Sequence, residues 1–263
     1  MPSLSGWFEN LLFNGGSVNR VVTVIGSGGK TSLIWHLAVS FNRISSQHQD
    51  LKILVTPTTK MFVPSLEEGL YNHLFISGEL PPSPVPGVTL AGVLNKASGK
   101  LESFSQETLE KLVSGYDLVL IEGDGSRGLP LKAWGENEPV VPVFTDLTIG
   151  MLPLTSIGKP VSENLVHRLP LFTKLSGAVP GENIKTEHVL RIITGGAAGT
   201  GENTPPGLFA KAKGKKLLFF NQAENEGALE QAREIAEKLP AGFRSALGGI
   251  IAGSVKDDWI MEL

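Results

Sequence analysis

Residues 21–32 read Val-Val-Thr-Val-Ile-Gly-Ser-Gly-Gly-Lys-Thr-Ser, a β-branched apolar run that leads directly into glycines, a lysine and two hydroxyl residues. This order is typical of a strand, a phosphate-binding loop and the start of a helix. Glycines let successive backbone N–H groups surround phosphate oxygens, and the N-terminus of the helix favours the same anion. We expect phosphate to be bound by the consecutive residues Gly26, Ser27, Gly28, Gly29, Lys30, Thr31 and Ser32.

The loop is shorter than the common phosphate-binding form. G-x-x-x-x-G-K-[ST] would require glycine at position 24, where the chain has Val24. The contracted form G-x-x-G-K-[ST], which Mur-type peptide ligases carry, is satisfied by residues 26–31. The alternative interpretation is a glycine-rich β-to-α turn with a surface lysine. The apolar run before the loop and the helical spacing of Leu33, Leu37 and Phe41 after it favour the phosphate loop.

Strand-like and helical patterns alternate along the chain. We expect strands at 21–25, 51–56, 88–93, 118–121, 217–220 and 246–252, and helices at 31–44, 106–113 and 227–239. The unbroken apolar run at 118–121 suits a strand covered on both faces of a parallel sheet. These patterns predict an α/β protein with a three-layer, doubly wound, mostly parallel sheet like that of P-loop NTPases. We expect a single domain over 1–263, with inserted or appended segments around 61–105 and 129–200.

Composition restricts the classes of partner. The chain has 263 residues, 41% of them hydrophobic, a formal net charge of −3 and no cysteine. A mildly acidic chain has no general attraction to nucleic acid or to an anionic membrane, so we expect neither as a partner. The lack of cysteine excludes disulfides and thiolate metal ligands. No apolar run approaches the length of a membrane span, and we expect a soluble cytoplasmic protein.

Polar residues follow the second predicted strand, in the run Thr56-Pro57-Thr58-Thr59-Lys60. The carboxyl ends of parallel strands share one edge of a sheet, which is where ligands bind in open α/β folds. We therefore expect Thr58, Thr59 and Lys60 to contact the terminal phosphate or its metal. The alternative is a turn in which the threonines bond to their own backbone.

Two carboxylates and a guanidinium follow the strand at 118–121, in Glu122-Gly-Asp124-Gly-Ser-Arg127-Gly128. An acidic residue at this position in phosphate-loop proteins holds Mg²⁺ or its water, and an arginine can neutralise charge on a transferred phosphoryl group. The predicted metal ligands are Thr31, Glu122 and Asp124, with the order of the two carboxylates left open. The predicted catalytic residues are Lys30, Asp124 and Arg127.

The run Asn221-Gln222-Ala223-Glu224 follows the strand at 217–220. Its position is similar to that of the N-K-x-D segment with which GTP-binding proteins read the base, and it predicts base contacts from Asn221 and Glu224. An ordinary strand-to-helix turn is the alternative. Farther back in the chain, a helix cap at Ser162 is predicted to place His167 and Arg168 where they could face a substrate.

The chain resembles the YqeC family over most of its length, from about residue 20 to the final predicted strand. The resemblance rests on Gly26–Ser32, Val55–Lys60, Glu122–Gly128 with Pro130-Leu-Lys132, and Gly158-Lys-Pro160 with Ser162-Glu163 and His167-Arg168. That family is described as accessory proteins of selenium-dependent molybdenum hydroxylases. The resemblance implies as partners such a hydroxylase or the proteins that mature its cofactor, and it implies that Arg127 and Lys132 border the substrate.

Together these features predict a Mg²⁺-dependent protein that binds ATP or GTP and hydrolyses it or transfers its γ-phosphoryl group, in service of maturing a molybdenum hydroxylase. Two alternatives stay open. One is a small-molecule kinase or a Mur-like ligase that forms an acyl-phosphate. The other is a non-catalytic chaperone that senses nucleotide or carries a cofactor.

Overall fold

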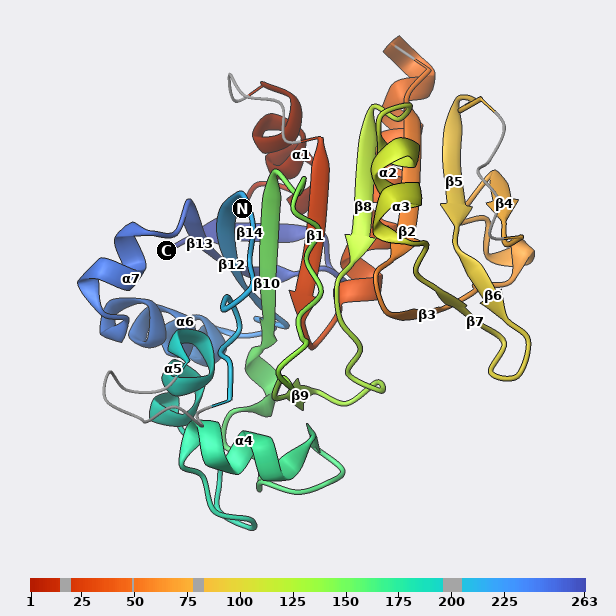
Figure 1. Ribbon diagram of the computed structural model, residues 1–263. Coiled ribbons are helices and arrows are strands. Elements are labelled where there is room, and N and C mark those ends of the chain that lie inside the picture. The colour runs from red at the N-terminus through yellow and green to blue at the C-terminus, as the bar shows by residue number, and fades with distance from the viewer. Residues whose placement is uncertain (15–19, 49, 78–82, 196–204) are drawn as a thin grey trace.

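A nine-stranded sheet forms the centre of the computed structural model, which describes residues 1–14, 20–48, 50–77, 83–195 and 205–263. The strand order is β14-β13-β12-β10-β1-β8-β2-β5-β4 (Figure 1). Every neighbouring pair is parallel except β13 and β14. The strands are β1 (Val21–Gly26), β2 (Lys52–Pro57), β4 (His73–Phe75), β5 (Gly87–Ala91), β8 (Leu118–Glu122), β10 (Leu147–Pro153), β12 (Lys215–Asn221), β13 (Gly249–Ser254) and β14 (Trp259–Glu262).

Helices cover both faces of this sheet. Alternate residues of β1 point to opposite faces, so Val24 packs in one apolar cluster with Leu33 and Phe41, while Ile25 packs in another with Phe172 and Ile235. The first face carries α1 (Leu4–Glu9) and α2 (Lys30–His48). The second carries α3 (Gln106–Val113), α4 (Leu169–Ser176), α5 (Thr186–Thr194) and α6 (Glu226–Lys238), and α7 (Ala241–Ser245) follows α6. The predicted three-layer α/β class is confirmed.

Two small sheets flank the carboxyl edge of the large one. The antiparallel sheet comprises β3 (Lys60–Phe62), β7 (Lys100–Glu102) and β6 (Val93–Asn95), and the parallel pair comprises β9 (Leu131–Lys132) and β11 (Val166–His167). Short single turns lie at Asn10–Asn14, Leu66–Glu68 and Leu154–Ser156. Residues of β3, β7 and β11 line the cleft above the phosphate-loop region.

Most predicted elements are present with shifted ends, and α3 has the predicted bounds. The predicted strand at 88–93 is wrong at its last two residues, because β5 ends at Ala91 and Val93 begins β6 in the separate small sheet. The predicted last strand begins only at Gly249, after a turn, and β14 follows it.

Strand β10 was not predicted, yet it lies between β1 and β12 at the centre of the large sheet. It falls within the segment around 129–200 that we expected to be inserted or appended. The segment around 61–105 likewise supplies β4 and β5 to one edge of the large sheet as well as the small antiparallel sheet. Among the helices of the described chain, none has the length and apolar character that crossing a bilayer requires.

Candidate functional site

The loop between β1 and α2 is braced by the two strands on one side of β1. Ser27 N donates to the Met151 carbonyl of β10 at 3.0 Å. The side chain of Asn221, at the end of β12, donates to the Gly28 carbonyl at 2.7 Å and accepts from Val255 N at 3.1 Å. The amides in the first turn of α2 have no acceptors inside the helix and face the loop region, which makes this turn a favourable place for an anion.

Gly26 adopts a backbone conformation that only glycine accepts without strain. Its φ is +93°, and a Cβ at this position would lie 2.2 Å from the Met151 carbonyl oxygen. We expect Gly26→Ala to lower the free energy of unfolding by about 1–3 kcal/mol or more, because strain and backbone overlap add. Gly99→Ala is the matched control, since Gly99 also has positive φ (+66°) but a Cβ there would have no neighbour within 4 Å. Urea denaturation measures both, and equal losses would contradict the prediction.

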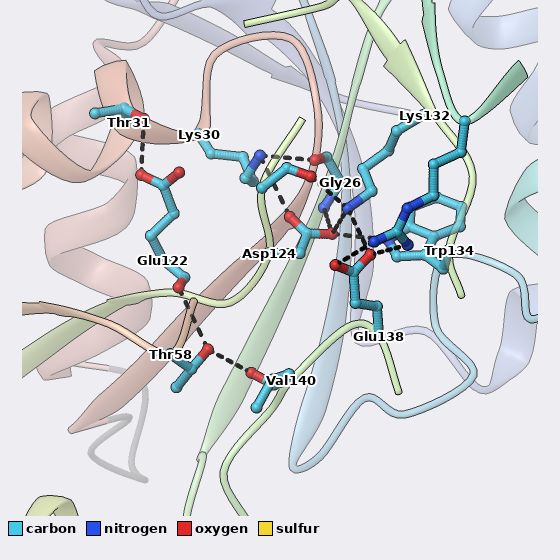
Figure 2. A network of polar contacts seen from close by, with 12 residues as sticks. Gly26, Lys30, Thr31, Thr58, Glu122, Asp124, Lys132, Trp134, Glu138 and Val140 are labelled. Carbon is cyan, nitrogen blue, oxygen red and sulfur yellow. Dashed lines mark hydrogen bonds and ion pairs between the residues drawn. The ribbon is translucent and has the colours of Figure 1, made fainter. Parts of the chain in front are cut away.

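Lys30 and Asp124 form the centre of a buried charged network beneath the loop (Figure 2). Lys30 is 4% exposed, and its Nζ donates to the Gly26 carbonyl at 2.8 Å and lies 3.3 Å from Asp124 Oδ1. The other oxygen of Asp124 accepts from Gly26 N at 3.0 Å and from Trp134 Nε1 at 2.7 Å. Burial is the largest single influence on the pKa of Asp124 and raises it, but Lys30, Lys132 and the two hydrogen bonds together lower it. Asp124 is therefore an ionised carboxylate held by surrounding donors.

Lys132 continues the network towards the far side of the cleft. Its Nζ lies 3.3 Å from both Asp124 Oδ2 and Glu138 Oε2, and it donates to the Gly125 carbonyl at 2.7 Å. Glu138 in turn accepts two hydrogen bonds from the Arg168 guanidinium. A continuous series of charges thus links the phosphate loop to Arg168, which precedes α4.

Glu122 and Thr31 meet at the end of β8 and the start of α2. Thr31 Oγ1 donates to Glu122 Oε2 at 2.7 Å (Figure 2). Burial raises the pKa of Glu122 above its usual range, against the opposing effects of Lys30 and the Thr31 hydroxyl. Glu122 lines the cleft, whereas Asp124 is fully buried and does not. Of the two predicted carboxylates, Glu122 is the one placed to reach a ligand.

A cleft of about 1060 Å³ lies over the loop and between the two small sheets. Nine of the predicted site residues line it: Gly28, Gly29, Lys30, Thr31, Ser32, Thr59, Lys60, Glu122 and Arg127. A second cavity of about 650 Å³ lies beside α2 and contains Asn221 and Glu224 in its lining. Gly29, Ser32 and Gln222 line both spaces, so the two meet at the loop.

Thr58 is placed differently from the prediction. Its hydroxyl donates to the Val140 carbonyl at 2.7 Å, its backbone N–H donates to the Glu122 carbonyl at 2.9 Å, and it lines neither cavity. Thr58 therefore connects β2 to β8 and to the chain before β10, a structural role that differs both from phosphate contact and from the alternative of a threonine bonded to its own turn. The neighbouring Thr59 lines the cleft, and its buried hydroxyl has no hydrogen-bond partner among the described residues.

Lys60, Gly26 and Ser27 are also placed differently from direct phosphate ligands. Lys60 lines the cleft from β3 but pairs with Glu102 at 2.8 Å. Gly26 and Ser27 lie beneath the loop and outside the cleft lining. No helix begins at Ser162, where a cap was predicted. A turn and β11 follow instead, and they still bring His167 and Arg168 to the cleft.

Several residues of the site were not predicted from the sequence. Trp134 and Glu138 belong to the charged network, and Thr155 lines the cleft and donates to the side chain of Gln222. Trp35 lines the smaller cavity with an indole N–H that is buried and without a hydrogen-bond partner in the described part of the chain. None of the four had a sequence signal, since even Trp35 lies off the helix face that Leu33, Leu37 and Phe41 define.

The fold and site define a mixed α/β protein in which a glycine-rich loop follows the central strand of a mostly parallel sheet, an arrangement compatible with that of P-loop NTPases. Comparison with known proteins gives the family. The family model described as YqeC protein matches residues 22–170. The relative named Uncharacterized protein YqeC from Escherichia coli strain K12 is 30% identical over 222 residues, which cover 81% of this chain and 80% of that protein. The chain belongs to the YqeC family.

Proposed function

We propose that this protein binds a nucleoside triphosphate together with Mg²⁺ at the loop, and hydrolyses it or transfers its γ-phosphoryl group. One observation carries the proposal: a buried lysine, the first turn of a long helix and Glu122 hydrogen-bonded to Thr31 line the same cleft. A cation, free helix amides and a hydroxyl–carboxylate pair at one place are the groups that binding a metal–polyphosphate requires.

The residues at the loop fit Mg²⁺, which completes its shell with phosphates and water, better than a metal ion whose ligands all come from the protein. Within the described residues no three histidine, cysteine, aspartate or glutamate side chains gather around one point. Mg²⁺ is commonly bound by one or two protein oxygens, with phosphates and water completing its shell. Thr31 and Glu122, whose oxygens are 2.7 Å apart, would hold it. When bound, the ion would supply charge neutralisation for the phosphates.

Lys30 would supply the other positive charge at the phosphates. Its Nζ is now bonded to the Gly26 carbonyl and paired with Asp124. Asp124 keeps three further donors in Gly26 N, Trp134 and Lys132, so it stays paired when Lys30 turns towards a phosphate. Asp124 would therefore act as a positioning residue for Lys30, and we do not retain it as a metal ligand.

The nucleoside would occupy the 650 Å³ cavity, which meets the cleft at Gly29, Ser32 and Gln222. The indole N–H of Trp35, which has no hydrogen-bond partner among the described residues, is a donor for a ribose or base oxygen or nitrogen. Asn221 is occupied by the Gly28 carbonyl and Val255 N, so the base contacts would come from other residues of this cavity, including the exposed Glu224.

Isothermal titration calorimetry with non-hydrolysable analogues of ATP and GTP, with and without Mg²⁺, tests the proposal directly. We expect binding to at least one analogue and tighter binding with Mg²⁺. Phosphate release from the natural nucleotide, with and without candidate acceptors, then separates hydrolysis from transfer. Binding with no turnover under any condition would instead favour the nucleotide-sensing chaperone.

Glu122→Gln should reduce the gain in nucleotide affinity that Mg²⁺ provides by about tenfold, because an amide is a poorer Mg²⁺ ligand than a carboxylate. The fold should not lose stability at pH 7. The pKa of Glu122 is raised above 4.5 in the folded protein. The free energy of unfolding therefore falls as the pH rises from 4.5 towards the pKa of Glu122 in the folded protein. Glutamine does not ionise, so the substitution removes this loss of stability. Calorimetry and urea denaturation measure the two effects. Glu237→Gln, an exposed change on α6, is the control, and an unaltered Mg²⁺ effect in Glu122→Gln would contradict the assignment.

The cellular role follows from the family resemblance alone. We propose that the nucleotide-dependent activity serves the maturation of a selenium-dependent molybdenum hydroxylase. The test is the molybdenum content of such a hydroxylase purified from cells with and without this protein. Equal metal content and equal activity in the two preparations would argue against the role while leaving the nucleotide site unaffected.

A further inference from the structure

Part of the large cleft is left uncovered by the proposed nucleotide. The phosphates would lie over Gly28–Ser32, and the nucleoside would extend through Gly29, Ser32 and Gln222 into the smaller cavity. The wall on the opposite side of the 1060 Å³ cleft is built by other elements: the loop after β8, strand β11 and the residue before α4. This inference rests on the proposed function for the position of the nucleotide.

That wall carries an excess of positive charge. Arg127 is exposed, and no hydrogen bond or ion pair holds its guanidinium within the described residues. Arg168 is held in position by two hydrogen bonds to Glu138, which also pairs with Lys132. Along the series of ion pairs that links Lys30 to Arg168, three cations, Lys30, Lys132 and Arg168, face two carboxylates, Asp124 and Glu138.

His167 lies within this field. Burial lowers its pKa most, and the positive charges of Lys132, Arg168 and Arg127 lower it further. The imidazole is therefore neutral at pH 7 although it is close to three cations. A neutral histidine among cations can donate one hydrogen bond. The Arg127 guanidinium, which has no hydrogen bond or ion pair within the described residues, presents a planar array of donors that matches an oxyanion. Arg168 uses two of its five N–H groups for Glu138, and the other three are its donors for a ligand.

We propose that the wall formed by Arg127, His167 and Arg168 binds the oxyanion group, phosphate or carboxylate, of a second small-molecule ligand that lies beside the nucleotide in the same cleft. The second ligand would then be the acceptor of a transfer reaction, because its anionic group and the terminal phosphate share one space. One oxygen of the second ligand would bond to the γ-phosphorus as the bond from that phosphorus to the β–γ bridging oxygen breaks. The nucleoside diphosphate would leave, and a proton carried by the attacking oxygen would pass to solvent. The chain Lys30–Asp124–Lys132–Glu138–Arg168 connects the two halves of this space, so Arg168 is held by the same charges that position Lys30.

Nuclear magnetic resonance of the histidine side chains tests the proposal, with the His167 signal assigned by its loss in His167→Gln. The protein is first saturated with Mg²⁺ and the analogue that binds, and inorganic phosphate is then added, or malonate in a parallel series. We expect the bound oxyanion to raise the pKa of His167 by about 1, since an opposite charge nearby favours the protonated ring. A response to only one of the two probes identifies which oxyanion the wall prefers.

Arg127→Gln should raise the probe concentration for half of this effect by about tenfold, the loss expected for a charge-assisted hydrogen bond. Arg244→Gln, on the remote helix α7, should leave it unchanged. No response to either probe would overturn the proposal. A second outcome would also overturn it: the analogue alone raises the pKa of His167, and neither probe raises it further. The wall would then bind the nucleotide phosphates, in agreement with the catalytic role predicted for Arg127.

The failure of the proposed function can be told apart from the failure of this inference. The same titration is carried out on nucleotide-free protein with Lys30→Ala, which removes the main cation of the loop. If wild-type protein binds no nucleotide but His167 still responds in this variant, the nucleotide proposal fails and the oxyanion site stands. If nucleotide binds and His167 does not respond in either experiment, the nucleotide proposal stands and the oxyanion site fails.

Discussion

Lys30→Ala is expected to weaken nucleotide binding by roughly 10- to 140-fold while the protein still folds, because a hydrogen bond to a charged group contributes about 1.5–3 kcal/mol and 1.4 kcal/mol corresponds to tenfold. Lys30 is the only lysine in the loop, and its ammonium lies between the Gly26 carbonyl and Asp124 at the base of the cleft. The fold should persist with a lower free energy of unfolding, because Asp124 Oδ1 loses the cation beside it while Oδ2 keeps Lys132, Trp134 and the Gly26 amide as partners.

Calorimetry on both proteins measures the effect, and circular dichroism with thermal unfolding verifies the fold. Lys238→Ala is the matched control, since Lys238 is an exposed lysine on α6 that pairs with the surface carboxylate of Glu234. It should bind nucleotide with wild-type affinity. A folded Lys30→Ala protein with unchanged affinity would remove the main support for a nucleotide site at this loop.

The loop could be predicted because the groups that build it are consecutive in the chain. Glycines, lysine and threonine at 26–31 specify a backbone conformation and a helix start with no help from distant residues. Strands β1, β2 and β8 could be predicted equally well, since each is a short, mostly apolar run that is buried on both faces of the sheet.

Strand β10 shows what local patterns cannot supply. Its sequence, Leu-Thr-Ile-Gly-Met-Leu-Pro, contains a glycine and a proline, which weaken any strand pattern. The glycine is explained by tertiary contact: a Cβ at Gly150 would lie 2.5 Å from the ring of Phe209, which is 59 positions later in the chain. The strand is stable because β1 and β12 pair with both of its edges.

The assignment of the two carboxylates also required the structure. Alternation along a strand decides which face a side chain takes, but β8 ends at Glu122, so alternation does not place Asp124. What places Asp124 is Trp134, ten residues later, together with Lys132. The Glu138–Arg168 pair spans 30 residues and has no periodic signal at all.

Lys132→Met is expected to lower the free energy of unfolding by about 3–5 kcal/mol, the usual cost of removing one partner from a buried ion pair. Lys132 is fully buried, and its ammonium contacts Asp124, Glu138 and the Gly125 carbonyl. Methionine fills a similar volume, so the loss measures charge and hydrogen bonding more than a cavity. Lys111→Met is the control, because the Lys111–Glu107 pair is exposed and such pairs contribute about 0–1 kcal/mol.

The pH dependence of this loss identifies its cause. In the wild type the pKa of Asp124 lies below 3.8, so its ionisation stabilises the fold above that pH, and the stabilisation is lost as pH falls through the folded pKa. Without Lys132 the pKa of Asp124 is higher, and protonation relieves the unpaired charge sooner. The difference in unfolding free energy between variant and wild type, measured by urea denaturation from pH 7 downward, should therefore shrink as the pH approaches 3.8. A difference that stays constant over this range would show that lost packing, and not the charge on Asp124, sets the cost.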